Sequence, residues 1–184
     1  MKTSLVKVGF KGDFLGYKSV EAVGAPSHAN NPYAFKIYAI DKAKALGYEV
    51  VLWCDASIYP VQSVQPALDW ISDKRYLMEE AGHYAGTWSN DRTLKYFGIT
   101  RDEAMKIPTF SAGFMGLDFT SELVREFYAR FKNSCLDGMF KGDWVNKNNS
   151  ESNDPRCKGH RHDLSCASII AHQLGMEYSE GALS

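Results

Sequence analysis

Apolar residues in the first third of the chain change from a strand pattern to a helix pattern and back again. Residues 5–10 and 20–23 predict two short strands, separated by a loop rich in glycine. Over residues 32–47 the apolar positions recur with helical spacing, between a proline and a glycine suited to begin and end a helix. Residues 48–54 are almost continuously apolar, which is typical of a strand covered on both faces. This order predicts a β-α-β unit that ends directly before Asp55.

The rest of the chain continues to alternate between strand and helix patterns. The predicted elements are a helix at 64–71, a strand at 75–78, short helices at 92–97 and 101–106, a glycine-interrupted strand at 109–117, an amphipathic helix at 121–131 and a final helix at 163–175. Asn90 and Thr100 are suited to cap the two short helices, and residues 138–162 are polar and predict a loop. The alternation predicts an α/β fold whose central sheet is mixed, mainly parallel and flanked by helices.

Composition and charge narrow the class of protein. The 184 residues fit one domain covering residues 1–184, and a hydrophobic content of 45% excludes a disordered chain. Lysine and arginine total 21 against 22 aspartate and glutamate residues, so no global field attracts nucleic acid or an anionic membrane. No apolar run reaches the roughly 20 residues that span a bilayer, and the first residues lack the apolar stretch of a secretory signal. These features predict a cytoplasmic protein without a membrane span.

The first candidate site lies where the strand predicted at 48–54 ends. Ligands of open α/β sheets bind beyond the carboxyl ends of the strands, and Asp55, Ala56 and Ser57 follow this strand. Asp55 and Ser57 are two residues apart, so they can present two oxygen ligands to Mg²⁺ or Mn²⁺ from one side of the chain. The alternative is that Asp55 only caps a turn and Ser57 is an ordinary loop hydroxyl.

The second candidate site lies at residues 157–163, directly before the final predicted helix. His160, His162 and Asp163 could supply imidazole and carboxylate groups to a metal ion. Arg161, together with the N-terminus of the helix, could hold a phosphate group. This segment therefore combines groups suited to metal binding and to phosphate binding.

Three other interpretations of this segment remain open. Asp163 could be the N-cap of the final helix, or an acid of its first turn that complements the helix dipole. A tetrahedral zinc site could be formed by Cys157, His160, His162 and Cys166, although the spacings match no familiar zinc finger. A metal-dependent phosphohydrolase could be built on His160, His162 and Asp163, but such helical enzymes need more histidine and aspartate ligands.

The third candidate site involves the helix predicted at 32–47 and the loop before it, which contains His28. Lys36 is a single cation on the early turns of an otherwise apolar helix, so burial of its stem would require an anionic partner. That partner could be a phosphate group or a structural carboxylate. Tyr33 could stack on a nucleotide base or fill the core.

Four segments of these candidate sites carry a resemblance to a known family. They are residues 31–36 (NPYAFK), 51–57 (VLWCDAS), 111–116 (SAGFMG) and 159–163 (GHRHD). In these segments the chain resembles GT-A type glycosyltransferases, and specifically the small glycosyltransferase-like proteins of large DNA viruses, including chlorella viruses, and of phages. The segments extend over most of the chain in the order that this fold requires. The resemblance implies a single GT-A-like (Rossmann-like) domain.

The resemblance also implies a site for a nucleotide-sugar donor. Asp55, Ala56 and Ser57 occupy the place of the family's Asp-x-Asp metal motif, with a neutral ligand, Ser57, at its third position. The implied cofactor is Mn²⁺ or Mg²⁺, held by Asp55, Ser57 and His162. The implied donor-binding residues are His28, Tyr33, Lys36, Asp55, Ala56, Ser57, Ser111, Ala112, Gly113 and Arg161.

The catalytic residue implied by the resemblance is Asp163. His162 and Asp163 resemble a late His-Asp-Gln or Asp-Gln element of the family. In this chain Leu164 stands in place of the glutamine. Asp163 would act as the base of an inverting enzyme or as a polar group beside the anomeric carbon in a retaining enzyme. The residues do not distinguish the two reaction types.

The resemblance implies a metal-assisted glycosyltransferase that moves a sugar from a UDP-sugar or GDP-sugar to a glycan or glycoprotein acceptor. Nucleic acid is not an expected partner. The chain is short for a complete glycosyltransferase, so acceptor recognition is expected to depend on a homodimer or on a further domain. The alternative is a nucleotide-sugar-binding or carbohydrate-binding protein of the same fold without efficient turnover.

Overall fold

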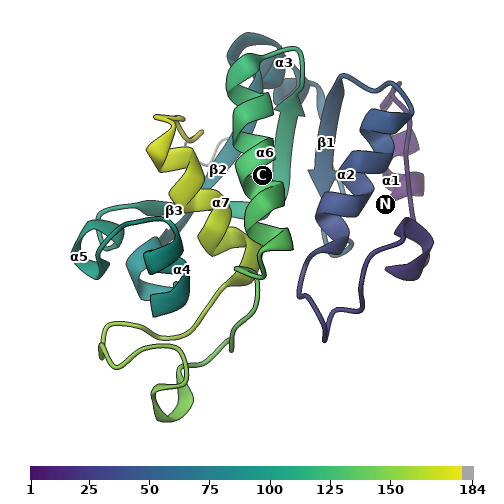
Figure 1. Cartoon of the computed structure of the whole chain (residues 1–184). Helices are drawn as coiled ribbons and strands as arrows, with labels where there is room; N and C mark the ends of the chain where they lie inside the picture. The colour runs from purple at the N-terminus through teal and green to yellow at the C-terminus, as the bar shows by residue number, and fades with distance from the viewer. Residues whose placement is uncertain (180–184) are drawn as a thin grey trace.

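A three-stranded antiparallel sheet lies at the centre of the computed structural model, which describes residues 1–179 (Figure 1). Its strands are β1 (Val50–Cys54), β2 (Tyr76–Tyr84) and β3 (Pro108–Asp118), in the order β1-β3-β2. Trp53 of β1 and Met78 of β2 both pair with Met115 of β3. The central strand therefore fixes the register of both neighbours.

The prediction of a mainly parallel sheet is wrong for these strands, because both strand pairs are antiparallel. Residues 5–10 form no strand: α1 (Lys2–Lys7) covers part of them and has no buried residue. Residues 20–23 contain the 3-10 helix η1 (Glu21–Val23). A short apolar run does not by itself distinguish a strand from a helix, so both strand predictions failed. Without a preceding strand the β-α-β unit predicted to end before Asp55 does not form, and β1 is a partly buried edge strand.

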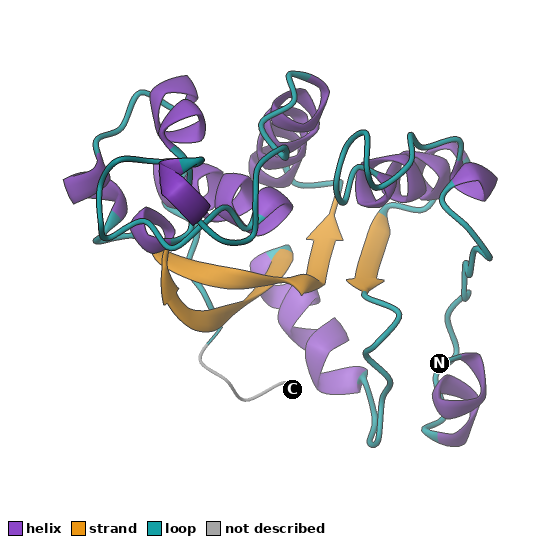
Figure 2. Ribbon diagram, turned by 90° about the horizontal axis from the view of Figure 1, so that it is seen from below, coloured by secondary structure: helices purple, strands orange, loops and turns teal. Residues whose placement is uncertain are grey.

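Helices cover both faces of the sheet (Figure 2). On one face, α2 (Phe35–Ala45), α6 (Glu122–Leu136) and α7 (His162–Gln173) share a large apolar core with β3. On the other face, α3 (Gln65–Lys74) packs Ile71 against the sheet, and a Cβ atom at Gly116 would collide with this side chain. Alternate residues of β3 thus serve the two faces, as the pleat of a strand requires.

The other predicted elements form close to their expected positions. The strand predicted at 75–78 extends further than expected, and α4 (Asp91–Tyr96) and α5 (Arg101–Ala104) match the two short helices. The Asn90 side chain accepts a hydrogen bond from the Thr93 amide, and Thr100 forms a capping box at the start of α5, as predicted. The polar segment before α7 contains only the short 3-10 helix η3 (Lys147–Asn149). A further 3-10 turn, η2 (Ala85–Thr87), follows β2.

Within residues 1–179, none of the helices has the length and apolar character needed to cross a bilayer.

Candidate functional site

The N-terminal ends of α2 and α7 and the C-terminal end of β1 lie near one another in the lower part of Figure 1. Lys36 is the second residue of α2, Asp55 directly follows β1, and Asp163 is the second residue of α7. Lys36 Nζ lies 2.6 Å from Asp163 Oδ2 and 3.3 Å from Asp55 Oδ1. These three residues are called the Lys36 cluster below. Three segments that the sequence suggested as separate candidates therefore meet at one point.

The Lys36 ammonium group is buried and fully engaged. An ammonium group has three donors, and here they face the Ala112 carbonyl oxygen at 2.7 Å and the two carboxylates. Burial by itself would lower the pKa of Lys36, but the charges of Asp163 and Asp55 outweigh it and raise the pKa. The sequence left two possible partners for Lys36, a phosphate group or a structural carboxylate. In the structure its partners are the carboxylates of Asp55 and Asp163. A phosphate group could reach this ammonium only by displacing one of its present acceptors.

Asp55 is held by its own strand and by β3. Its Oδ1 accepts a hydrogen bond from Trp53 Nε1 at 2.8 Å, and its amide donates to the Gly113 carbonyl at 2.8 Å. A Cβ atom at Gly113 would lie 3.1 Å from Asp55 Oδ2, so a residue without a side chain allows this close approach. The Asp55 side chain is 32% exposed, which leaves part of the carboxylate open to a ligand.

Three predicted site residues lie outside this network. Ala56 and Ser57 are exposed in the turn that follows β1, and Ser111 is a partly buried residue of β3. Within residues 1–179, no hydrogen bond or ion pair joins any of them to the Lys36 cluster. The geometry therefore gives Ser57 no part in holding Asp55 or Lys36.

Aromatic rings from two elements line the approach to the Lys36 cluster. The Tyr33 ring lies 5.3 Å from Lys36 Nζ and 5.3 Å from the His162 ring, and His28 contacts its edge at 4.8 Å. Tyr33 (φ 59°) and His162 (φ 50°) both adopt left-handed backbone conformations, which are strained for residues with a side chain. Burial, followed by the charge of Asp163, raises the pKa of the Tyr33 hydroxyl. These two strained residues meet beside the charged groups.

The two histidines of this segment differ in their surroundings. His162 Nδ1 lies 2.8 Å from the Phe140 carbonyl, which can only accept, so this nitrogen carries the proton. Burial lowers the pKa of His162, and its Nε2 is buried without a hydrogen-bond partner among residues 1–179. His160 Nε2 lies 2.9 Å from the Met139 carbonyl, and burial lowers the pKa of His160 to about 3. His162 thus has a free lone pair, whereas His160 is bonded within the fold.

Asp163 is not the N-cap of α7, but it is an acid of the first turn of this helix, as the second form of that alternative has it. The N-cap residue of α7 is Arg161, which makes no side-chain capping bond, and the Asp163 carboxylate turns instead toward Lys36. The zinc alternative also lacks support from the geometry. Cys157 contacts the Ser89 carbonyl, and in the described part of the chain no group of three or more histidine, cysteine, aspartate or glutamate side chains is arranged to hold a metal ion.

Two tryptophans that the sequence analysis did not select lie beside this site. The Arg161 guanidinium carbon is 4.0 Å from the centre of the Trp88 ring and 4.1 Å from that of Trp144. Trp144 also contacts the His162 ring at 5.4 Å. Both tryptophans occur in polar segments rich in glycine, and a large ring in such a segment is the signal that could have identified them.

Comparison of the chain with protein-family models, with curated proteins and with solved structures gives no match. The resemblance to GT-A type glycosyltransferases therefore stays a prediction. A function for this chain has to be argued from the site itself.

The ion pairs of the Lys36 cluster should contribute to the free energy of unfolding. Lys36→Met keeps the apolar stem but leaves two carboxylates without their cation, so the free energy of unfolding should fall by about 3–5 kcal/mol. Lys132→Met is the matched control, because Lys132 pairs with Asp41 at 2.7 Å while its side chain is 40% exposed. That variant should lose less than about 1 kcal/mol. Urea unfolding measures both, and equal losses would show that the Lys36 ion pairs do not stabilise the fold as described.

Proposed function

We propose that this chain is a glycosyltransferase that uses a nucleotide-diphosphate sugar as its donor. The observation that carries the proposal is the joining of Asp55 and Asp163 through Lys36. The resemblance implies that these two acids, which are far apart in sequence, belong to one donor site. An arrangement that brings them together is what such a site needs, and the absence of a side chain at Gly113 is what lets Asp55 take this position against β3.

The two carboxylates are suited to different tasks because their environments differ. Asp163 is 3% exposed and fixed by Lys36, so it has a defined orientation. We assign Asp163 to the reacting centre, where it accepts the proton of an acceptor hydroxyl or holds the donor sugar. Asp55 has a partly exposed carboxylate, and we assign it to the diphosphate side of the site. Lys36 positions both groups.

The aromatic residues around the cluster supply flat apolar surfaces. Tyr33 lies next to Lys36, and Trp53 lies 5.8 Å from the same ammonium, measured to the ring centre. Rings of this kind can stack on a nucleobase or on the apolar face of a sugar, and they exclude water from polar contacts nearby. A donor with a UDP or GDP moiety and a glycan acceptor fit this combination of charge and rings.

Mn²⁺ or Mg²⁺ is part of the proposal. His162 Nε2 has no partner among residues 1–179, and the Asp55 carboxylate is partly open, so each of these residues offers the cation an unused ligand atom. Since the described residues contain no complete metal-binding group, phosphate oxygens of the donor would supply further ligands. The bound cation would neutralise negative charge on the diphosphate leaving group.

The role of Asp163 is tested by removing its charge. Asp163→Asn keeps the shape of the side chain but cannot accept a proton, so donor turnover should fall by at least about 100-fold. Affinity for a nucleoside diphosphate should change little, because Asp163 is assigned to the sugar side. Release of nucleoside diphosphate from a panel of UDP-sugars and GDP-sugars measures turnover, and calorimetry with UDP and GDP measures affinity.

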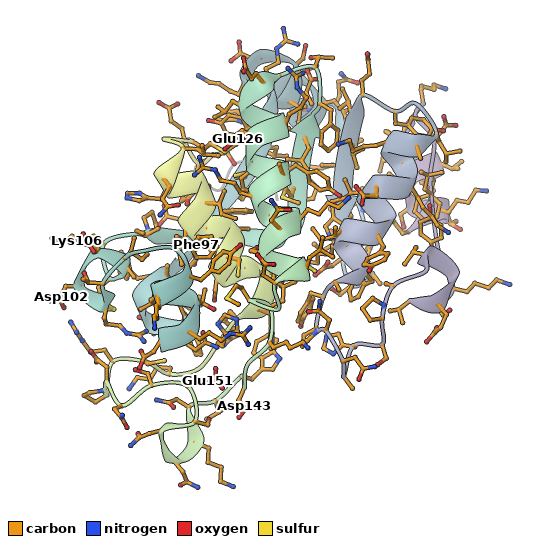
Figure 3. The ribbon with its side chains drawn as sticks, viewed as in Figure 1. Phe97, Asp102, Lys106, Glu126, Asp143 and Glu151 are labelled. Carbon is orange, nitrogen blue, oxygen red and sulfur yellow. The ribbon has the colours of Figure 1, made fainter. Side chains whose placement is uncertain are left out.

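The control for this experiment is Asp143→Asn. Asp143 is an exposed acid on the loop before α7 (Figure 3) and should leave turnover unchanged. Full activity of folded Asp163→Asn would remove Asp163 from the reacting centre. If the unmodified chain binds nucleotide but releases no product from any donor, it is a binding protein and the transfer reaction is wrong.

The metal assignment makes a separate prediction. Mn²⁺ should raise the affinity for UDP or GDP relative to EDTA, and Asp55→Ala should abolish that increase because it removes the partly exposed carboxylate. Calorimetric titrations of both proteins, each with Mn²⁺ and with EDTA, give the comparison. Equal affinities of the unmodified chain under the two conditions would contradict a metal role for Asp55.

A further inference from the structure

The Arg161 side chain is held between two tryptophan rings. Its guanidinium carbon lies 4.0 Å from the centre of the Trp88 ring and 4.1 Å from that of Trp144, so both rings are in close cation–π contact with the guanidinium group. Stacking on an aromatic face attracts the cation and also restricts its plane. The N–H donors of the group point outward in its plane, away from contacts made with its faces.

Those donors have no acceptor in the described part of the chain. None of the hydrogen bonds or ion pairs among residues 1–179 uses the Arg161 guanidinium, and its Nε is buried without a partner. Arg101 also has a buried Nε without a partner among residues 1–179, but its terminal nitrogens donate to the Gly86 and Ser89 carbonyls and pair with Asp91. Burial lowers the pKa of Arg161 from its ordinary value. A partly buried guanidinium with unused donors is unfavourable unless a ligand satisfies it.

The Trp88 and Trp144 rings are held in position by hydrogen bonds of the neighbouring backbone and not by burial in the core. The Trp88 carbonyl accepts hydrogen bonds from the Arg161 amide at 3.0 Å and from the Ser165 hydroxyl. Trp144 is 45% exposed, yet the loop that carries it is fixed by the His160 amide, which donates to the Asp143 carbonyl at 2.7 Å.

Glu151 forms hydrogen bonds within the same loop and to Asn90, the N-cap residue of α4. Its carboxylate accepts from the Asp143 amide at 2.9 Å and from Asn90 Nδ2 at 2.8 Å (Figure 3). An exposed ring on a segment fixed in this way is preorganised for a ligand, because binding would not have to order the loop.

We propose that Arg161, clamped by Trp88 and Trp144, is a binding subsite for an oxyanion. The guanidinium fork matches the two oxygens of a phosphate or carboxylate group, and it binds them bidentately. The tryptophan faces keep water away from this contact and so strengthen it. The oxyanion is either the diphosphate of a donor, a source that depends on the proposed function, or the carboxylate of an acidic sugar, a source that does not.

Tryptophan fluorescence reports directly on this subsite, because two of the four tryptophans of the chain flank Arg161. The probes are inorganic pyrophosphate and glucuronate, each titrated in EDTA so that no metal contributes. We expect a saturable change with at least one probe. Arg161→Gln should weaken that probe at least tenfold, on the order of a lost charge-assisted pair. Arg161→Lys should also weaken it, because an ammonium cannot make the fork contact.

The matched control is Arg130→Gln. Arg130 is an exposed residue of α6 that pairs with Glu126, and its loss should leave the affinity for both probes unchanged. Circular dichroism establishes which variants are folded. If Arg161→Gln does not fold, Arg161→Lys decides the question, since it keeps the charge and most of the stem.

The outcomes separate the two ligand sources and the two proposals. Tighter binding of pyrophosphate supports the diphosphate source, and tighter binding of glucuronate supports the acidic sugar. Wild-type affinity in a folded Arg161 variant, or no saturable change in the unmodified chain up to about 10 mM of either probe, would overturn the subsite. Pyrophosphate binding at Arg161 without any sugar transfer would leave the subsite standing and contradict only the proposed function.

Discussion

An ammonium group is costly to remove from water unless anionic partners replace its hydration, and at Lys36 two carboxylates and a carbonyl do so. These acceptors belong to the start of α7, the end of β1 and the central strand β3. The contacts of Lys36 therefore join the helices α2 and α7 to the neighbouring strands β1 and β3. One cation against two carboxylates also leaves excess negative charge at the site. A cationic partner, whether a metal ion or a protein side chain nearby, is consequently favoured there.

Local signals in the sequence predicted most of the elements on which the site depends. The helical spacing around Lys36 predicted α2, and the apolar run before Asp55 predicted β1. Both elements form because core packing agrees with these local patterns. The caps at Asn90 and Thr100 were also predictable, since a capping side chain and its amide partner are three residues apart. In these places the local preference and the overall fold agree.

The arrangement of the strands could not be predicted in the same way. Whether residues 5–10 form a strand depends on finding a neighbouring strand, and in the fold they lie at the surface, where α1 buries no residue. The direction of β3 relative to β1 depends on how the chain passes from α3 through β2 and back, which no local pattern encodes.

The candidate site was predictable in its residue types but not in its pairing. A buried cation on an apolar helix called for an anionic partner, but only the fold identifies Asp55 and Asp163 as the two that meet it. Trp88 and Trp144 were missed because their contact with Arg161 joins residues distant in sequence. Side chains that are brought together by tertiary structure leave at most a weak local signal, such as a tryptophan in a polar loop.

The central claim is that the groups gathered around Lys36 form the donor site. A crystal structure of the chain soaked with UDP or GDP and Mn²⁺ tests it most directly. The account predicts diphosphate density beside Asp55, with Lys36 still bound to both carboxylates and Tyr33 facing the ligand. Nucleotide bound elsewhere on the molecule, or a Lys36 side chain withdrawn from Asp163 to contact phosphate, would contradict it.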